Sequence, residues 1–331
     1  MRRRVPFLYL DALTDLARQY DKDDFCENFI MKKLSILLLA LLMPATSALA
    51  NITPLPLPEN KGQPVGQILL HTAQEGDTLA SLARYYGVSP ILMLAANPDQ
   101  DLFLLKPGQE LVIPNQLLLP RADTKGIVIN LAELRLYYYP EDGSDVYVFP
   151  IGIGRVGRAT PEMTTSISQM RKNPTWTPTT TTRREYEKMG KPLPAVVPAG
   201  PDNPLGQYAM RLAYGSGEYL IHGTNDPLDV GLRASAGCIR MYPEHVEWLF
   251  AQVDKGVQVQ IVNQALKVST DEYGQTFIES HEPLTPEGLA DDRPLDMSKL
   301  TPLIEQGANR ELIEQIISHR QGMPQLVGQL P

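Results

Sequence analysis

Alternation with a period of two dominates the chain from residue 125 onward, and this spacing is typical of β-strands. The alternating apolar positions are Ile127, Ile129, Leu131, Leu134, Leu136, Tyr138, Val146 and Val148, with a polar turn at residues 141–144 before the last two. Further strands are predicted at residues 208–212, 219–222 and 257–262, and a helix at residues 243–253. The pattern predicts a mainly β domain over residues 125–263, in which one helix follows Cys238.

A shorter segment, residues 68–114, mixes the two periods. A strand at residues 68–72 leads to Asp77 or Thr78, either of which can cap a helix, and apolar residues follow at helical spacing. A second helix over residues 90–96 ends at Asn97-Pro98, and a strand at residues 110–113 closes the segment. The order β-α-α-β predicts a small separate module.

Proline interrupts the stretch of residues 173–206, which is otherwise polar. A loop of this length in a compact domain is usually either a functional lid or a disordered linker. Because it carries Trp176, Arg183, Arg184 and Tyr186, we expect an ordered cover. Residues 264–331 follow as a C-terminal extension, with strands predicted near Val268 and Phe277 and a helical part over residues 302–318.

The chain is acidic, with a net charge of −8 and a pI near 5.2, and it has no run of basic residues, which argues against a nucleic-acid partner. Residues 31–50, MKKLSILLLALLMPATSALA, have a basic start, a short apolar run and small residues at the end, as a cleavable signal peptide does. We therefore expect translation to start at Met31 and residues 1–30 to be a mis-assigned extension. The mature chain is expected to be exported, with no stable membrane span.

Cleavage after Ala50 removes Cys26 and leaves Cys238 as the one remaining thiol. A lone exported thiol forms no internal disulfide, so it is either buried and inert or chemically reactive. A zinc site requires about four ligands, and the glycines of residues 152–157 lack the following helix that a dinucleotide site requires. No metal or cofactor is expected.

His222 and the residues around Cys238 favour the reactive alternative. A histidine can accept the thiol proton, and a strand ending at His222 followed by a loop can bring both residues to one sheet edge. Gly237 permits close backbone approach, so the main-chain N–H groups of Ala236, Gly237 and Cys238 can form an oxyanion site.

Several polar residues are candidates for substrate binding. The Ser235 hydroxyl lies near the thiol in sequence, and the Arg240 guanidinium can hold a carboxylate. Arg240 can equally pair with Glu244 or Glu247. The other candidates are Tyr208, Arg183 and Arg184, and the two arginines are expected to hold a donor substrate beneath the cover.

The small module resembles a LysM domain, a binder of glycans that contain N-acetylglucosamine. The resemblance rests on Gly76-Asp77-Thr78-Leu79, residues 83–88, Ala96-Asn97-Pro98 and Lys106-Pro107-Gly108-Gln109. It implies that Gly76, Asp77, Thr78 and Asn97 contact the glycan. The alternative is a scaffold that no longer holds sugar.

Residues 221–225, Ile-His-Gly-Thr-Asn, and residues 235–241, Ser-Ala-Gly-Cys-Ile-Arg-Met, resemble the signature of L,D-transpeptidases with a YkuD-type catalytic domain. The resemblance implies a YkuD-like β-sandwich with Cys238 as nucleophile, His222 as base and the Gly223 carbonyl orienting the imidazole. It also implies acylation of Cys238 by carbapenems. Many members have histidine at the position of Ala236, so no role is expected for that side chain.

The order of signal peptide, LysM-like module, catalytic domain and the tail at residues 319–324 resembles the Gram-negative periplasmic subgroup that attaches the Braun lipoprotein to peptidoglycan. This implies attack on the bond between diaminopimelate and D-alanine of a tetrapeptide stem, followed by transfer to the C-terminal lysine of the lipoprotein. The alternatives are 3→3 crosslinking of stem peptides, cleavage of the lipoprotein link, a cysteine peptidase, and a non-catalytic peptidoglycan-binding protein.

Overall fold

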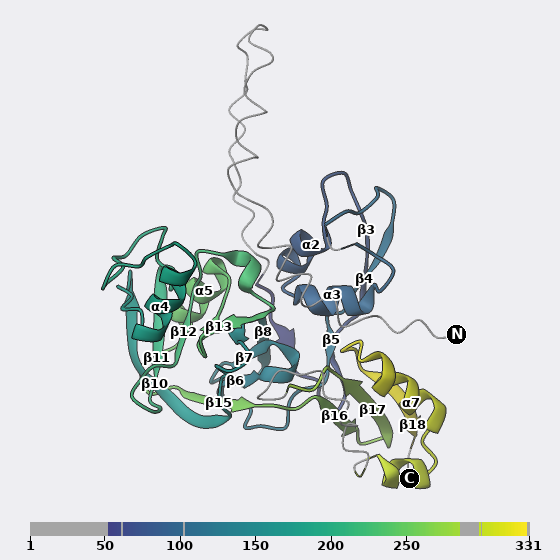
Figure 1. Ribbon diagram of the computed structural model, residues 1–331. Coiled ribbons are helices and arrows are strands. Elements are labelled where there is room, and N and C mark those ends of the chain that lie inside the picture. The colour runs from purple at the N-terminus through teal and green to yellow at the C-terminus, as the bar shows by residue number, and fades with distance from the viewer. Residues whose placement is uncertain (1–51, 61, 102, 285–297, 299, 330–331) are drawn as a thin grey trace, which may run out of the picture. The chain divides into compact units, whose positions relative to one another are not determined.

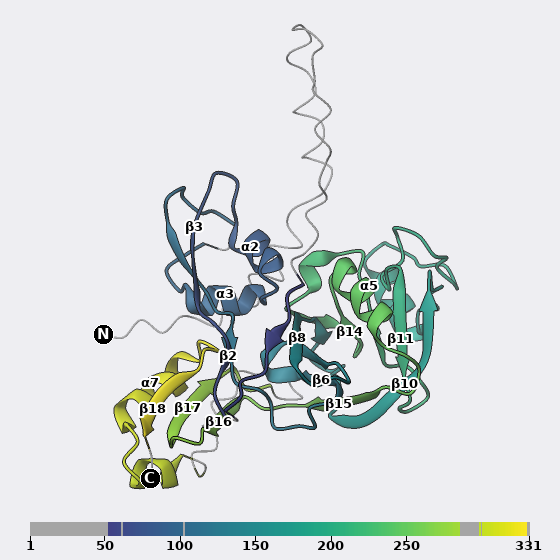
Figure 2. The same ribbon diagram turned by 180° about the vertical axis from the view of Figure 1, so that it is seen from behind.

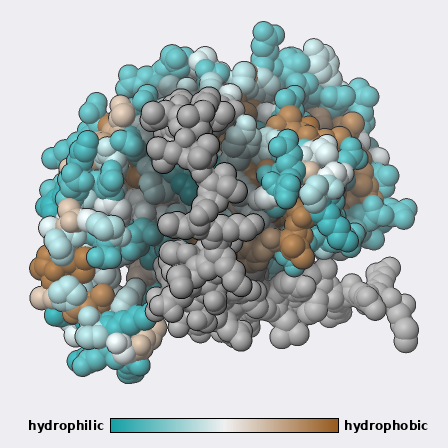
Figure 3. All heavy atoms as spheres, turned by 90° about the horizontal axis from the view of Figure 1, so that it is seen from above, coloured by the Kyte–Doolittle hydropathy of each residue, from teal (hydrophilic) through white to brown (hydrophobic). Residues whose placement is uncertain are grey.

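The computed structural model describes residues 52–60, 62–101, 103–284, 298 and 300–329 (Figure 1). The predictions for residues 1–30 and for a signal peptide at residues 31–50, including Cys26, lie outside the described residues. Within the described residues, no single helix has the length and apolar character needed to cross a membrane, although the bent pair of helices Leu79–Tyr85 and Pro90–Ala96 meets that test when taken together. Seen from above, the described surface is mostly hydrophilic, with apolar residues in small groups (Figure 3).

The small module has the predicted order of strand, helix, helix and strand. It consists of β3 (Leu69–Thr72), α2 (Leu79–Tyr85), α3 (Pro90–Ala96) and β4 (Glu110–Ile113), with β3 and β4 antiparallel. Thr78 caps α2, because its side chain accepts a hydrogen bond from the Ser81 N–H while the Ser81 hydroxyl accepts one from the Thr78 N–H. Leu79, Leu111 and Ile113 are fully buried between the helices and the strands.

The larger, mainly β domain is built on one nine-stranded mixed sheet. In spatial order its strands are β1 (Leu55–Pro56), β8 (Asp145–Pro150), β7 (Arg135–Tyr139), β6 (Gly126–Asn130), β15 (Gln258–Val262), β10 (Met163–Lys172), β11 (Tyr208–Leu212), β12 (Leu220–His222) and β14 (Ile239–Arg240). The β6–β15 and β12–β14 pairs are parallel, and the other neighbours are antiparallel. The mainly β class is confirmed, and among the described residues the strands follow one another in a single long mixed sheet. The sandwich arrangement stays a prediction.

The remaining short elements of this region pair locally. Strands β9 (Ile153–Gly154) and β13 (Arg233–Ser235) form a parallel pair, and β2 (Val65–Gly66) pairs with β5 (Gln116–Leu117). Two 3-10 turns, η1 (Leu131–Glu133) and η2 (Pro227–Asp229), connect strands. Helix α5 (Pro243–Gln252) is the helix predicted after Cys238, and a second helix, α4 (Thr180–Lys188), which the sequence did not predict, lies in the proline-rich cover.

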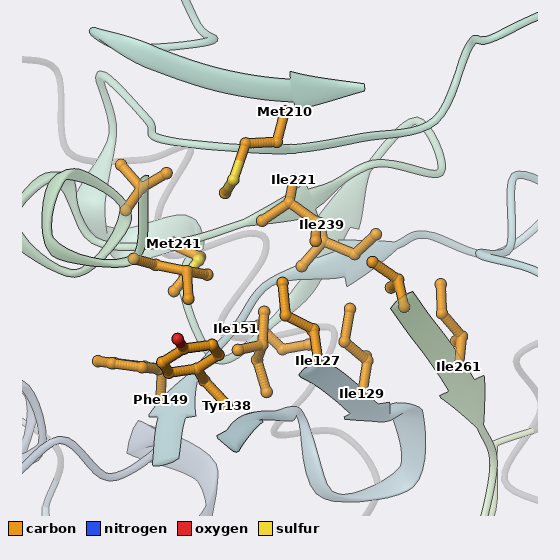
Figure 4. Packing of buried hydrophobic residues seen from close by; sticks show 14 of the residues in the cluster. Ile127, Ile129, Tyr138, Phe149, Ile151, Met210, Ile221, Ile239, Met241 and Ile261 are labelled. Carbon is orange, nitrogen blue, oxygen red and sulfur yellow. The ribbon is translucent and has the colours of Figure 1, made fainter. Parts of the chain in front are cut away.

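The core of the domain lies against one face of the sheet. Its buried residues include Ile127, Ile129, Phe149, Met210, Ile221, Ile239 and Met241 (Figure 4). Figure 2 shows β10 and β11 side by side, with α5 next to β11. The opposite face of β11, β12 and β14 is therefore available for chemistry.

Strand β10 was not predicted, because a bulge breaks its period. Ile167 lies opposite Leu212, whereas Gln169 lies opposite Arg211, so Ser168 is the extra residue. The bulge lets Ile167 and Met170, three positions apart, both contact the core, and it turns Gln169 and Arg171 to the other face. The Ser168 hydroxyl donates to the Arg211 carbonyl oxygen at 3.1 Å and supports the bulge.

The C-terminal extension forms a three-stranded antiparallel sheet with two helices. Its elements are β16 (Leu266–Thr270), β17 (Gln275–Ser280), α6 (Thr301–Glu305), α7 (Arg310–His319) and β18 (Gln325–Gln329). The two strands and the helical part agree with the sequence pattern, whereas β18 was not predicted. Ile278, Leu300, Ile313 and Val327 form the small core of this unit.

A cluster of buried charges joins this extension to the main sheet. Lys267 Nζ lies 2.8 Å from Glu133 Oε2 and 3.0 Å from Glu279 Oε1, and Arg135 and His281 contact the same carboxylates. Burial opposes the charge of Glu133, yet the charges of Lys267, His281 and Arg135 outweigh it and lower the pKa of this carboxyl to about 2. Glu133, Glu279 and His281 are close enough together to share a cation, but the Lys267 ammonium already contacts both carboxylates.

We expect Lys267→Met to lower the free energy of unfolding by about 3–5 kcal/mol, because it leaves two buried carboxylates with less compensation. The measurement is denaturant unfolding of the full chain. Glu282→Gln is the matched control, since Glu282 pairs with Arg320 near the surface, and loss of such a pair changes stability by less than about 1 kcal/mol. Equal stabilities of the two variants would contradict the assignment.

Candidate active site

The site lies at the end of the sheet where β12 and β14 run parallel. Ile221 lies opposite Ile239 and His222 opposite Arg240, and both isoleucines point into the core (Figure 4). Since side chains alternate along an extended chain, His222 and Arg240 project to the opposite face. Cys238, two positions before Arg240, projects to that face too. The predicted pair therefore occupies neighbouring strands at one sheet edge.

The Cys238 thiol is half-buried and protonated at neutral pH. Its Sγ donates to the Glu218 carbonyl oxygen at 3.3 Å. Burial raises the pKa of the thiol, and this effect exceeds the lowering caused by a main-chain hydrogen bond from Leu220 and by the Arg240 charge. The thiol therefore needs a base before it can act as a nucleophile.

His222 has the properties of such a base. Its Nδ1 lies 2.5 Å from the Gly223 carbonyl oxygen, and because a carbonyl can only accept, Nδ1 carries the hydrogen. The other ring nitrogen, Nε2, then carries the lone pair that can accept a proton. Burial, followed by the nearby Arg240 charge, lowers the pKa of His222 to about 3, so the imidazole is neutral at neutral pH.

The loop before Cys238 is held by side-chain hydrogen bonds to its backbone. The Ser235 hydroxyl donates to the Cys238 carbonyl at 2.6 Å and accepts from the Gly237 N–H at 3.1 Å. Thr160 donates to the Gly237 carbonyl at 2.9 Å and accepts from the Gly154 N–H at 3.0 Å. Gly237 has a φ of +110°, and a Cβ there would lie 3.2 Å from the Tyr219 ring, so only glycine fits.

These hydrogen bonds correct two predictions. Ser235 is 1% exposed, and its hydroxyl already donates one hydrogen bond and accepts another. It therefore braces the loop and does not face a substrate. The Gly237 N–H is likewise engaged, which leaves the N–H groups of Ala236 and Cys238 as oxyanion candidates. Thr160, which the sequence analysis did not single out, also holds the backbone at Gly237, and it does so from the loop that follows β9.

Two further substrate-binding predictions are not supported by the geometry. Arg240 pairs with Asp229, and neither Glu244 nor Glu247 is its partner. Glu244 instead pairs with Arg84 of α2. Tyr208 lies in the core, where its hydroxyl donates to Glu247 of α5 at 2.7 Å, so its side chain is on the face opposite Cys238.

The proline-rich cover is ordered, as the sequence indicated. Glu185 of α4 contacts Arg155 at 2.8 Å and Arg158 at 2.9 Å, and both arginines belong to the loop that supports Gly237. Arg183 and Arg184 are both exposed on the same helix, and neither side chain forms an ion pair with a described residue. The cover is thus tied to the loop of the nucleophile through Glu185.

The glycan-binding candidates of the small module differ in what they offer. Gly76 is exposed and has a φ of +91°, and Thr78 caps α2. The Asp77 carboxylate accepts from the Gln74 N–H at 2.8 Å and lies 3.0 Å from His71 Nε2. Asn97 is 7% exposed, and its amide makes three hydrogen bonds of 2.8 Å to Met93 and Val112. Asn97 is therefore a structural residue, which corrects its prediction as a glycan contact.

Comparison with known proteins agrees with both domains. Residues 124–261 match the YkuD family, described as the L,D-transpeptidase catalytic domain, and residues 71–114 match the LysM domain. The chain is 43% identical over 277 residues to the probable L,D-transpeptidase YcfS of Escherichia coli (strain K12), covering 81% of this chain and 86% of the relative. It is 48% identical over 259 residues to the probable L,D-transpeptidase ErfK/SrfK of the same strain, covering 77% and 82%.

Among solved structures, the chain is similar to the NMR structure of the catalytic domain from an E. faecium L,D-transpeptidase acylated by ertapenem. The identity is 22% and the TM-score 0.32, and the match covers 43% of this chain and 99% of that chain.

We expect the rate of iodoacetamide alkylation of Cys238, followed by peptide mass mapping, to rise about tenfold per pH unit between pH 6 and 8. The reason is that a thiol with a raised pKa gains its reactive thiolate only as the pH approaches that pKa. His222→Gln is expected to leave this slope unchanged. A rate plateau at acidic pH that disappears in His222→Gln would show a preformed thiolate–imidazolium pair and contradict the account.

Proposed function

Since this chain belongs to the L,D-transpeptidase family, we propose that Cys238 is the thiol on which its reaction with peptidoglycan takes place. The protein is an enzyme of the cysteine transpeptidase class, with a LysM module that implies binding of peptidoglycan. The observation that carries the proposal is the parallel register of β12 and β14, which puts a neutral imidazole and a protonated thiol on one face of the sheet.

In the first half-reaction, His222 Nε2 removes the thiol proton while Sγ attacks the carbonyl carbon between diaminopimelate and the terminal D-alanine of a tetrapeptide stem. The C–S bond forms, the C–N bond breaks, and the imidazolium returns the proton to the departing D-alanine amine. The N–H groups of Ala236 and Cys238 are the donors proposed to stabilise the oxyanion. Burial of His222 favours this proton return, because it destabilises the imidazolium.

In the second half-reaction an amine attacks the thioester. Its nitrogen forms the new amide bond and His222 accepts the amine proton. The C–S bond breaks, and the imidazolium returns that proton to the sulfur, which restores the thiol. We propose that the preferred amine is the side chain of a C-terminal lysine of an outer-membrane lipoprotein. Support comes from the order of LysM module, catalytic domain and C-terminal extension, which resembles the periplasmic subgroup with that activity. The proposed location is the periplasm, because residues 31–50 have the composition of a signal peptide.

Incubation of the enzyme with a tetrapeptide stem and a peptide that ends in lysine is expected to release D-alanine and yield a branched ligation product. Mass spectrometry identifies both products. Cys238→Ala is expected to abolish them without unfolding, since the thiol takes part in no disulfide. Ligation to a second stem peptide in preference to the lysine peptide would favour 3→3 crosslinking, and release of D-alanine without ligation would indicate a peptidase.

We also expect Glu185→Gln to slow formation of the acyl-enzyme by between about threefold and tenfold, because the cover loses its two contacts to the loop of the nucleophile. Glu187→Gln on the same helix is the matched control, since no ion pair of Glu187 is present among the described residues. Single-turnover mass spectrometry gives the rate. Equal rates in both variants would remove the cover from the mechanism.

A further inference from the structure

Two arginines that have no ion-pair partner among the described residues lie on the face of His222, one and two strands away from it. Ala209 of β11 lies opposite His222, and Arg171 of β10 lies opposite Ala209. In the neighbouring row, Leu220 of β12 lies opposite Arg211. Because these positions face each other across the sheet, Arg171 and Arg211 project to the same side as His222 and Cys238.

The two arginines line one pocket. Its lining also includes Gln169 and Leu220 of the sheet, and Thr175 and Leu205, which lie near the two ends of the cover in the sequence. Arg211 also lies against the turn at Gly217, because its Nη1 atom is 3.1 Å from the position that a Cβ of Gly217 would occupy. The next residue, Glu218, accepts the hydrogen bond of the Cys238 thiol. The pocket therefore adjoins the reacting atoms on the side of His222.

The charge of this pocket is not compensated within the described residues. Neither Arg171 nor Arg211 forms a salt bridge there, whereas Arg155, Arg158 and Arg240 each have a carboxylate partner. Two guanidinium groups in one partly covered pocket favour an anionic ligand, and the planar fork of arginine fits a carboxylate.

Position and distance decide which carboxylate fits. Neighbouring strands lie about 4.8 Å apart, so the Arg211 backbone is roughly 10 Å from that of Cys238. The acceptor amine must give its proton to His222, and it therefore enters on the side where the pocket lies. In a C-terminal lysine, six bonds separate the side-chain nitrogen from the carboxylate carbon, a span of about 7 Å. In D-alanine, and in the amino-acid end of diaminopimelate, only two bonds separate them, which is too short.

From these observations we propose that the pocket formed by Arg171 and Arg211 binds the terminal carboxylate of an acyl acceptor that attacks through a lysine side chain. The inference rests on the proposed function and deepens it. The pocket selects an acceptor with a free C-terminus, and it places the amine beside His222. Neither arginine is a catalytic residue, since both act through the position of the acceptor.

The test compares two acceptor peptides, one ending in lysine with a free carboxylate and one ending in lysine amide, on the acyl-enzyme formed from a tetrapeptide stem. We expect the wild-type chain to ligate the free acid about 10- to 100-fold faster, as the loss of charge-assisted hydrogen bonds predicts. Arg171→Gln and Arg211→Gln are expected to reduce this ratio toward one. The rate at which D-alanine is released as the acyl-enzyme forms, measured without acceptor, is expected to stay within about twofold of the wild type. Arg310→Gln, an exposed arginine at the start of α7, is the control that keeps the ratio.

Three outcomes would overturn the inference. Wild-type ligation that does not distinguish acid from amide shows that no group reads the carboxylate. A second outcome is that the two arginine substitutions slow D-alanine release as well as ligation, and that amidation of the donor's glutamate or diaminopimelate carboxylate slows release by the wild type equally. These two results together assign the pocket to the donor. Absence of any acyl-enzyme on Cys238 removes the proposed function and the subsite together, so the two failures are distinguishable.

Discussion

The chemistry depends on the parallel pairing of two very short strands, β12 and β14, at the end of the main sheet. This register alone places Ile221 and Ile239 in the core and His222, Cys238 and Arg240 on the other face. A shift by one residue would exchange the two sets, burying the thiol and exposing the isoleucines. The hydrophobic core thus opposes a one-residue shift, because such a shift exposes fully buried apolar residues.

The structure around this pair keeps it neutral and fixed in place. Burial lowers the pKa of His222 to about 3 and raises that of Cys238, so both groups are uncharged until the reaction begins. Thr160 and Ser235 hold the loop before the thiol through backbone hydrogen bonds, and Asp229 holds Arg240. Ser235, which the sequence offered as a substrate contact, therefore positions the backbone, while Arg171 and Arg211 have no ion-pair partner among the described residues.

The sequence predicted those parts of the fold that have a regular pattern. Strand β11, helix α3 and strand β4 have the predicted bounds, and α5 ends one residue earlier than expected. The bulge at Ser168 broke the period of β10 and so hid Arg171, which only the register of β10 and β11 places on the catalytic face. The buried cluster around Glu133 and Lys267 joins residues more than a hundred positions apart, a kind of contact that no local pattern reveals. For Asn97 and Tyr208, residue type suggested binding, but their burial gives them structural roles.

The most direct measurement of the central claim is the intact mass of the full chain after rapid mixing with a tetrapeptide stem and acid quenching. The account predicts a mass increase equal to the stem without its terminal D-alanine, located by peptide mapping on Cys238 and released by hydroxylamine as a thioester is. His222→Gln should slow this acylation by at least about a hundredfold, as loss of a general base predicts. An adduct on another residue, or unchanged acylation in His222→Gln, would contradict the account.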